Sequence, residues 1–368
     1  MSEFDYSKVI DLLEHGDISG WFGNSTGGPY LQELEKKFAQ ACGAKYAFGV
    51  SSGSASIYVG LKACGVGPGD VVPVPAYTHV GSVAPIVLAG ATPLFIDVDD
   101  YGDLDPNDLE HVLTARSLKI KAVVVVHQLG VPCNMIGIRS VVGGDVAIVE
   151  DASHALGGRY AGHSIPVGNV GCFSIGGGRT KTIGTGEGGM VVTNDDELAE
   201  KCRNIRNHGD RAMDVPYFCF NFRMSDLNAA VGLAQIEKLD FLNKHQAENA
   251  KYIVERLPNF LSVPKPPEGS TWYIIGCYFD EHLAGMSRGE FLKIVEAKGF
   301  KGGLPRKNIG SGYVRLISDM KLYQSYWRFL AKSEWIRDHS VWIDWHRWPR
   351  TKEEIDTMLD CLRSIGKR

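Results

Sequence analysis

Apolar and polar positions alternate between two spacings along the first two thirds of this 368-residue chain. Leu31, Leu34 and Phe38, for example, repeat at the spacing of an amphipathic helix. Similar helical patterns cover 54–64, 82–89 and 197–206. Runs typical of buried strands lie at 47–50, 71–75, 92–98, 122–126, 146–150 and 189–194. The alternation predicts an α/β domain with helices on both faces of a mostly parallel sheet.

The pattern changes beyond about residue 245, close to a group of prolines at 258, 264, 266 and 267. A long amphipathic helix is expected just before the change, over 225–241. After it, the spacing predicts a strand over 272–280 and helices over 288–298 and 351–364. We therefore expect a large domain over 1–245 and a smaller α+β domain over 246–368, with residues 1–20 as a candidate for packing on the smaller domain.

The composition argues against several classes of protein. A net charge of −4 provides no basic surface for nucleic acid or anionic lipid. No apolar run approaches the ~18 residues that span a bilayer, and the first 17 residues lack the apolar core of a signal peptide. The eight cysteines include no C-x-x-C pair and no zinc spacing. We expect a soluble, cytoplasmic protein with reduced cysteines and no metal, membrane or nucleic-acid partner.

A turn of serine and glycine at 51–56 separates a predicted strand from a helix. The first N–H groups of a helix have no partner within the helix and lie at its positive end, which suits a phosphate. The 43 glycines of the chain, against the roughly 26 of an average composition, also suggest backbone that approaches a ligand closely. An ordinary strand-to-helix turn with a serine N-cap has the same pattern, so this motif alone leaves both interpretations open.

Asp151 stands at the carboxyl end of a predicted buried strand, where open parallel sheets bind their ligands. A carboxylate is costly to bury there unless it meets a cation or several hydrogen-bond donors. A protonated pyridine nitrogen is one such cation. An aspartate that caps the following helix would have the same pattern.

Lys181 lies in a glycine-rich loop just before the strand predicted over 189–194. A lysine held in such a loop can lose its proton and attack a carbonyl carbon, although a solvated loop lysine is commoner for this motif alone. An anion-binding turn, a strand-end carboxylate and a loop lysine, in that order, are the three parts that bind pyridoxal 5′-phosphate. The three motifs together predict that Lys181 carries this cofactor as a Schiff base.

Seven ordered blocks of the sequence point to a known family. The blocks are Gly28-Pro29-Tyr30 with 34–38, Ser52-Gly53-Ser54-Ala55, Gly67-Pro68-Gly69-Asp70, 75–79, 150–154, Thr180-Lys181 with 186–189, and 220–226. In this order and spacing the chain resembles the DegT/DnrJ/EryC1/StrS family of pyridoxal-phosphate-dependent sugar aminotransferases. The resemblance implies the fold-type-I transferase architecture, in which helices flank a mostly parallel mixed sheet in a large domain and a smaller α+β domain follows.

The resemblance also implies roles around the cofactor ring. Lys181 would form the Schiff base, and Asp151 would pair with the pyridinium nitrogen. His154 would lie near the phenolic oxygen of the cofactor. His79 stands where the family usually stacks an aromatic ring on the cofactor, and a histidine can stack less extensively.

At the phosphate, the resemblance implies contacts from Gly53, Ser54 and Ala55. Asn221 would reach the phosphate from the neighbouring subunit, so a homodimer with shared active sites is expected. The family usually has a phosphate-binding serine five residues before the lysine. Ser174 lies seven residues before Lys181, as if two residues were inserted near the glycines at 176–178, which leaves its role open.

Lys181 favours amino transfer, because relatives that remove a hydroxyl group have histidine at that position. The expected reaction takes an amino group from glutamate or glutamine, through pyridoxamine phosphate, to a keto-sugar or keto-cyclitol in amino-sugar, antibiotic or surface-polysaccharide biosynthesis. Another fold-type-I lyase or dehydratase, and a non-catalytic regulatory protein that binds the cofactor, are the alternatives. The segment 302–306 does not match the family's usual His-Tyr-Pro-like segment, so the acceptor stays open.

Other conspicuous residues have structural interpretations. His127 ends a predicted strand and is expected to be a satisfied core histidine. Core or interface packing is the favoured interpretation of Trp342, Trp345 and Trp348. Arg223 is expected to form an ion pair at a subunit interface.

Overall fold

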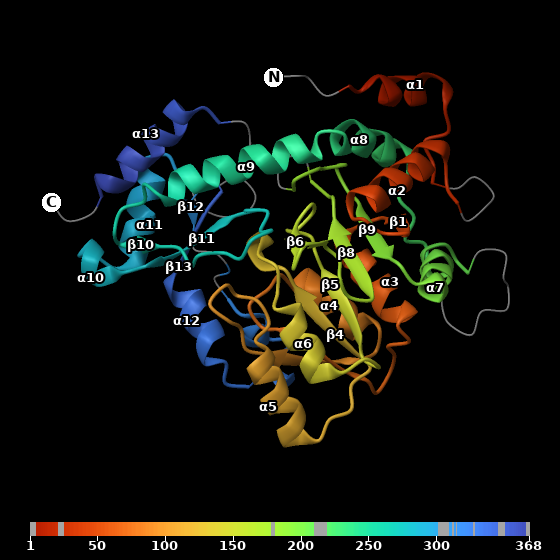
Figure 1. Ribbon diagram of the computed structural model, residues 1–368, viewed down its shortest axis with the longest axis horizontal. Helices are drawn as coiled ribbons and strands as arrows, with labels where there is room; N and C mark the ends of the chain where they lie inside the picture. The colour runs from red at the N-terminus through yellow and green to blue at the C-terminus, as the bar shows by residue number, and fades with distance from the viewer. Residues whose placement is uncertain are drawn as a thin grey trace.

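The computed structural model describes residues 5–20, 26–177, 181–209, 219–300, 309–310, 313, 315–326, 328–344 and 350–365. Its larger region contains a five-stranded sheet with the order β1-β9-β8-β5-β4 (Figure 1). The strands are β1 (Tyr46–Val50), β4 (Ala122–Val126), β5 (Ala147–Asp151), β8 (Val170–Ser174) and β9 (Gly189–Thr193). The hydrophobic pattern predicted all of these except β8, whose short apolar run is interrupted by Gly171.

The strands of this sheet run mostly in one direction. β9 is antiparallel to β1 and to β8, whereas β8, β5 and β4 are parallel to one another. Strands β1, β8, β5 and β4 therefore point the same way, and the predicted mostly parallel sheet is confirmed. A parallel pair, β2 (Val71–Pro75) and β3 (Thr92–Ile96), adjoins β4. The carboxyl ends of β4, β5 and β8 consequently meet at one edge, the usual ligand-binding edge of such a sheet.

Helices cover both faces of the sheet, because neighbouring residues of a strand point to opposite sides. On one face, Cys172 and Val191 pack with α3 (Gly53–Ala63), α4 (Val80–Leu88) and α7 (Asp196–Arg206). On the other face, Phe173 and Val192 pack with α2 (Pro29–Ala41) and α8 (Asp226–Ile236). β4 and β5 are further covered by α5 (Pro106–Arg116) and α6 (Met135–Val142). A short hairpin, β6 (Arg159–Tyr160) with β7 (His163–Ser164), follows β5.

The C-terminal region has an antiparallel sheet of its own, in the order β10-β11-β13-β12. Its elements are β10 (Leu261–Ser262), β11 (Ile275–Phe279), β12 (Ile309–Gly310), β13 (Ser340–Ile343), α10 (Glu281–Ala284), α11 (Arg288–Ala297), α12 (Ala331–His339) and α13 (Lys352–Arg363). Short 3-10 turns occur at Gln128–Gly130, Ile317–Asp319 and Gln324–Tyr326. β11 begins later than predicted because Trp272 has a left-handed backbone with φ of 57°. Phe279, Val295 and Leu359 belong to a separate core cluster, as expected of an α+β unit.

The single long helix predicted over 225–241 is wrong. The structure has α8, then a break at Lys238, where φ is −106° and ψ is 7°, and then α9 (Leu239–Val254). Apolar spacing continues across the break, so periodicity could not reveal it. Leu239 and Leu242 pack with the larger core and Ala250 and Ile253 with the smaller one, so α9 runs from one region into the other (Figure 1). The predicted boundary at residue 245 falls within this helix and stays a prediction.

The first helix, α1 (Ser7–His15), packs against α8 of the larger region, whereas residues 1–20 were a candidate for packing on the smaller domain. Lys8 pairs with Glu33 of α2 at 2.7 Å, and Tyr30 donates to Asp11 at 2.8 Å. The helix thus contacts α2 and α8, and the sequence pattern could not specify which helices those would be.

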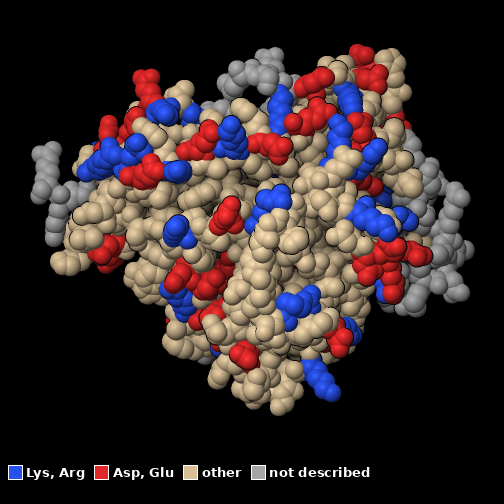
Figure 2. Space-filling model, in the orientation of Figure 1, with Lys and Arg blue, Asp and Glu red and all other residues tan. Residues whose placement is uncertain are grey.

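All eight cysteines are free, and five of them are buried. No helix among the described segments is both long and apolar enough to cross a membrane. Lys, Arg, Asp and Glu intermingle on the face of the molecule shown in Figure 2, without a large area of one sign. Oppositely charged side chains also form pairs in the structure, for example Lys37 with Glu237 at 2.6 Å.

Candidate active site

A cavity of about 350 Å³ opens at the carboxyl edge of the main sheet. This volume is within the range of ~300–1,000 Å³ that is common for small-molecule sites. Val126, Asp151 and Ser174, the last residues of β4, β5 and β8, all line it. The candidate residues that the structure brings to this cavity are Gly53, Ser54, His79, Asp151, His154, Ser174 and Lys181.

Asp151 faces the cavity with both carboxylate oxygens already bonded. Ser82 donates its hydroxyl to Oδ2 at 2.7 Å, and the backbone N–H of Ser153 donates to Oδ1 at 3.1 Å. The residue is 7% exposed. These donors compensate part of the cost of burying a carboxylate, and the open side of the cavity leaves room for a cation.

Glu150, the residue before Asp151 on β5, points to the opposite side of the sheet and has a structural role. Its carboxylate accepts from His127 Nε2 at 2.8 Å and from the backbone N–H groups of Val167 and Gly168. The Nδ1 atom of His127 accepts from the Cys133 N–H at 3.0 Å, so the proton of the neutral ring lies on Nε2. Both side chains are fully buried, in agreement with the interpretation of His127 as a core histidine.

Two helix N-termini converge at one end of the cavity. At the start of α3, Ser52 caps the Ala55 N–H at 3.1 Å and accepts the Ser56 N–H at its carbonyl oxygen. Helix geometry leaves the first-turn N–H groups of Gly53 and Ser54 for a ligand. Ala55 itself is buried, does not line the cavity and has its N–H capped, so its predicted phosphate contact lacks this donor.

The second N-terminus belongs to α4, whose N-cap is His79. Its Nδ1 accepts the Gly81 N–H at 3.0 Å. A Cβ on Gly81 would stand only 2.9 Å from Ser54 Oγ, so the two helix ends are in close contact. The positive ends of both helix dipoles therefore face the same space, which favours an anion. Burial, and after it the nearby Lys181 ammonium, lower the pKa of His79.

Two glycines, Gly53 and Gly189, are closely packed at the end of the cavity where α3 begins. A Cβ on Gly53 would stand 2.5 Å from Ser174 Cβ, and one on Gly189 would overlap the Ser52 carbonyl oxygen. Neither substitution fits without a shift of backbone. Ser174 therefore lies directly against the α3 N-terminus, and its N–H donates to Ser153 Oγ at 3.0 Å. The two apparent extra residues before Lys181 do not remove Ser174 from the cavity.

Lys181 reaches the cavity from the loop before β9. Its Nζ lies 5.2 Å from the centre of the Tyr273 ring. His154 stacks on the same ring, with 4.0 Å between the two ring centres and 12° between the planes. The lysine and the histidine thus contact one tyrosine, which comes from the C-terminal region.

Sequence reasoning missed several residues that line the cavity, namely Ser52, Thr78, Ser82, Ser153, Glu187, Tyr273 and Tyr313. Ser52, Thr78, Ser153 and Glu187 belong to blocks that the resemblance quoted, so the sequence did carry a signal for them. Tyr273 and Tyr313 reach the cavity only through the packing of the two regions, and no local pattern marked them. Tyr313 contacts Tyr77 and Trp342, with ring centres at 5.2 and 4.8 Å.

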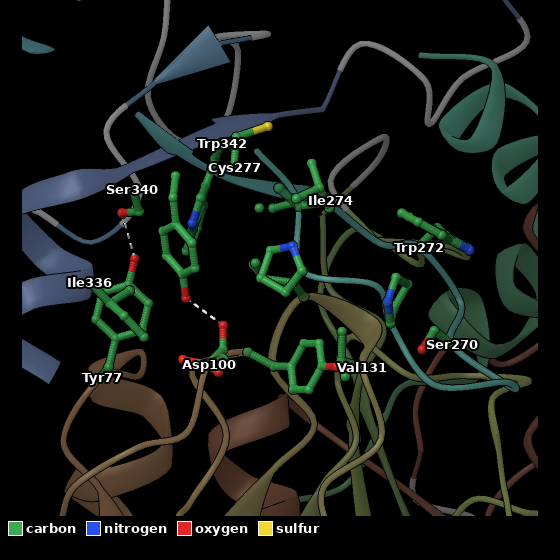
Figure 3. A pocket seen from close by; sticks show the side chains of 17 residues that line it. Tyr77, Asp100, Val131, Ser270, Trp272, Ile274, Cys277, Ile336, Ser340 and Trp342 are labelled. Atoms are coloured by element: carbon green, nitrogen blue, oxygen red, sulfur yellow. Dashed lines mark hydrogen bonds between the residues drawn. The ribbon is translucent and has the colours of Figure 1, made fainter. Parts of the chain in front are cut away.

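A second cavity lies behind Tyr77, between the C-terminal strands and the loop after β3 (Figure 3). The Tyr77 hydroxyl is hydrogen-bonded to Ser340 Oγ at 3.1 Å, and the Tyr278 hydroxyl donates to the Asp100 carbonyl oxygen. Trp342 lines the cavity and is 8% exposed, in agreement with its interpretation as a core residue. These contacts hold Tyr77, and with it the following turn at Thr78, against the C-terminal region.

The remaining predictions concern residues away from the cavity. Asn221 is exposed, accepts the Arg223 N–H at 3.2 Å and does not line the cavity of its own chain. Arg223 donates to Asn207 within the chain at 2.8 Å. Trp345, Trp348 and the segment 302–306 lie outside the described residues. Among the described residues, no cluster of His, Cys, Asp or Glu is suited to a metal ion.

The chain is similar to known proteins over nearly its whole length. The model of the DegT/DnrJ/EryC1/StrS aminotransferase family matches residues 6–362. A DegT DnrJ EryC1 StrS aminotransferase from Brucella abortus is 24% identical, with a TM-score of 0.87, over 98% of this chain and 95% of that one. DesV from S. venezuelae, solved with a ketimine intermediate, is 26% identical, with a TM-score of 0.84, over 98% and 94%. The GDP-4-keto-6-deoxymannose-3-dehydratase ColD, solved as a mutant with bound GDP-perosamine, is 22% identical, with a TM-score of 0.85, over 98% of each chain.

Proposed function

We propose, because the chain belongs to the DegT/DnrJ/EryC1/StrS aminotransferase family, that it is a pyridoxal-phosphate-dependent aminotransferase that moves an amino group from glutamate or glutamine to a keto-sugar or keto-cyclitol. The observation that carries the proposal is one cavity that joins Lys181, Asp151 and two helix N-termini. Pathways that make amino sugars, antibiotics or surface polysaccharides would use this reaction.

The donor set of the cavity fits pyridoxal phosphate. Gly53 and Ser54 at the α3 N-terminus, with Ser174 beside them, provide donors for a phosphate at one end. Asp151 is an acceptor suited to a protonated ring nitrogen, and Lys181 is the amine for the aldehyde. When bound, the cofactor supplies an electrophilic aldehyde and a ring that withdraws electrons from the α-carbon of an amino acid.

Lys181 would hold the cofactor and then, once an amino donor has displaced it, move a proton from the donor's α-carbon. General acid–base catalysis by a positioned side chain contributes typically 10²–10⁴-fold. Its position in a loop before β9, rather than in a strand, allows the amine to move between these two tasks. Tyr273 lies beside the amine, with its ring centre 5.2 Å from Nζ.

Asp151 would keep the proton on the ring nitrogen. An opposite charge at hydrogen-bond distance raises the pKa of a cation by about 1–3 units. His154, which stacks on Tyr273, would lie beside the cofactor ring. His79, at the α4 N-terminus, would cover a face of the cofactor ring. Both assignments follow the family resemblance, and the structure brings both residues to the cavity.

The active unit is proposed to be a homodimer. Asn221 is exposed in the chain and lies outside its own cavity, as expected of a residue that would serve the neighbouring site. Phe220, next to it, is 66% exposed and would be covered by the partner subunit in the proposed dimer. A complete phosphate site would then need both subunits.

A dehydratase is the second candidate, because ColD has the same fold and is named a dehydratase. Lys181 argues against it, since the family's dehydratases have histidine at that position. The sugar product formed in the presence of glutamate separates the two activities. An aminotransferase gives a sugar that carries the donor's nitrogen in place of the ketone oxygen, whereas a dehydratase gives a sugar that has lost a hydroxyl group and has gained no nitrogen.

The test of the proposal is reduction of the loaded protein with borohydride, followed by peptide mass spectrometry. We expect the cofactor mass on the peptide that contains Lys181 and a visible absorbance band that Lys181→Ala lacks. Lys201→Ala, which removes a surface lysine paired with Glu197, is the matched control and should retain the band. Persistence of the band and of the label in the Lys181 variant would contradict the assignment.

A further inference from the structure

Ser82 makes a buried hydrogen bond to Asp151, and the proposed function assigns Ser82 no role. Its Oγ donates to Asp151 Oδ2 at 2.7 Å, the distance of an O–H···O⁻ bond to a charged acceptor. Ser82 is 1% exposed. A hydroxyl that is buried in this way has little access to solvent, and Asp151 is the acceptor within its reach.

Thr78 extends this contact by one more hydroxyl. Its Oγ1 lies 3.0 Å from Ser82 Oγ, and Thr78 is 2% exposed. Ser82 has one hydroxyl proton, and a carboxylate only accepts, so that proton lies toward Asp151. Thr78 must then be the donor to Ser82. The hydrogen bonds therefore run in one direction, from Thr78 through Ser82 to Asp151.

The helix itself does not need the Ser82 hydroxyl. The N-cap of α4 is His79, whose own side chain accepts the Gly81 N–H. Ser82 stands in the first turn of α4, where a small residue of any kind would fit the helix. Its hydroxyl is thus available for a contact outside the helix, and Asp151 is the group that it contacts.

The contact bears on where a proton would lie between Asp151 and a pyridine nitrogen. A hydrogen bond to the charged form of a carboxylate stabilises that form. A carboxylate without the Ser82 donor would be a stronger base and would compete with the ring for the proton. An oriented chain of donors also fixes the direction in which the free lone pairs of the carboxylate face the cavity.

We propose that Ser82, supported by Thr78, is a positioning residue that keeps Asp151 ionised and aimed so that the proton stays on the ring nitrogen of the cofactor. This inference rests on the proposed function. It assigns Ser82 an action through Asp151 and no contact with the substrate.

The experiment measures the ring nitrogen directly. The wild type and Ser82→Ala are loaded with pyridoxal phosphate labelled with ¹⁵N in the ring, and solid-state NMR reports whether that nitrogen carries a proton. We expect a protonated nitrogen in the wild type and a shift toward the unprotonated signal in Ser82→Ala. The half-reaction with the amino donor should slow about 10- to 100-fold, with little change in the donor concentration at half-maximal rate.

Three variants separate positioning from packing. Ser82→Thr retains the hydroxyl and should restore most of the wild-type ¹⁵N signal. Thr78→Val removes only the supporting donor and should give a smaller shift in the same direction. Ser318→Ala removes another buried serine hydroxyl, one without a hydrogen-bond partner among the described residues and outside the cavity, and should leave the signal unchanged.

Each outcome decides between the proposals. A Ser82→Ala enzyme with the wild-type ¹⁵N signal overturns the inference, even if its melting temperature falls, because packing alone then explains the residue. Should Ser82→Ala fail to fold or load, an unchanged signal in Thr78→Val overturns it. A wild type that does not take up the cofactor at Lys181 overturns the proposed function instead.

Discussion

The two carboxylates at the end of β5 are the same chemical group in different surroundings. Glu150 lies on one side of the sheet with its oxygens bonded to His127 and to two backbone N–H groups, and it is fully buried. Asp151 lies on the other side, with one donor on each oxygen and a cavity of about 350 Å³ in front of it. Side chains alternate across a strand, so one step along the chain separates a structural acid from a candidate catalytic one.

The difference shows what makes a buried acid available for chemistry. Both carboxylates have donors that offset their burial, but only Asp151 retains an open direction toward a cavity. Both oxygens of Glu150 accept hydrogen bonds from groups of the fold itself, so its role is structural. Substitutions at the two positions should therefore separate stability from activity.

The largest effect is expected from Glu150→Ala. The substitution leaves the His127 N–H and the N–H groups of Val167 and Gly168 buried without acceptors. The free energy of unfolding should fall by about 3–5 kcal/mol, measured by chemical denaturation. The control Glu33→Ala removes a partly exposed partner of Lys8 and should cost less than about 1 kcal/mol. Equal losses in the two variants would contradict the structural role of Glu150.

Asp151→Asn should show the opposite pattern. The amide oxygen can still accept a hydrogen bond, so the free energy of unfolding without cofactor should change by less than about 1 kcal/mol. Loss of the charge removes the partner of the ring nitrogen, and the rate of amino transfer should fall about 10- to 1,000-fold. Denaturation and single-turnover kinetics on one preparation check both parts. A variant that unfolds easily yet transfers amino groups at the normal rate would show that Asp151 has a structural role, like Glu150.

Gly53→Ala tests the phosphate end of the same cavity. The added methyl group would meet Ser174 at 2.5 Å, and overpacking of this kind costs about 1–3 kcal/mol. We expect the affinity for pyridoxal phosphate to fall roughly 5- to 100-fold in equilibrium titrations. Gly289→Ala is the matched control, because nothing lies within 4 Å of the added atom in α11. Similar affinities of the two variants would rule out the contact with Ser174 as a determinant of binding.

The last prediction concerns the pH dependence of stability and Asp99, a third kind of carboxylate. Burial raises its pKa to about 6, against hydrogen bonds from Tyr101 and Asp103 that lower it. The folded state keeps this proton after the unfolded chain, with a value of 3.8, has released it. The contribution of Asp99 to stability is therefore complete below about pH 4 and is lost as the pH rises to about 6.

Urea denaturation of the wild type and Asp99→Asn over this pH range measures the effect. The amide does not titrate, so the stability of the variant relative to the wild type should increase between about pH 4 and pH 6 and level off above it. A difference that is independent of pH would show that Asp99 titrates at its ordinary value in the folded protein.

The sequence was sufficient for much of the larger region. The runs at 122–126 and 189–194 became strands because a sheet covered on both faces needs continuous apolar residues, which are visible locally. The order of the Ser52 turn, Asp151 and Lys181 predicted one cofactor cavity, and the structure brings the three together. The resemblance added His154 and Ser174, which also line that cavity.

Other features depend on tertiary contacts and could not be predicted from the sequence. The break at Lys238 and the packing of α1 on α8 depend on which surfaces meet, and spacing along the chain does not encode that. Tyr273 enters the cavity from a segment far along the chain from Lys181, because the C-terminal region folds back onto the sheet edge. Ser82 stood in a predicted helix, with nothing in its neighbourhood to mark a bond to an acid 69 positions away.

By itself, the amino-acid sequence determined the class of fold, the family and the chemical types that the cavity holds, because periodicity and motif order are local properties of a chain. The tertiary structure alone decided which hydroxyls contact Asp151, what surrounds Glu150 on the other side of the strand, and which tyrosines line the cavity. Those choices depend on strand register and on the docking of distant segments, where one residue of shift exchanges the two faces of a strand.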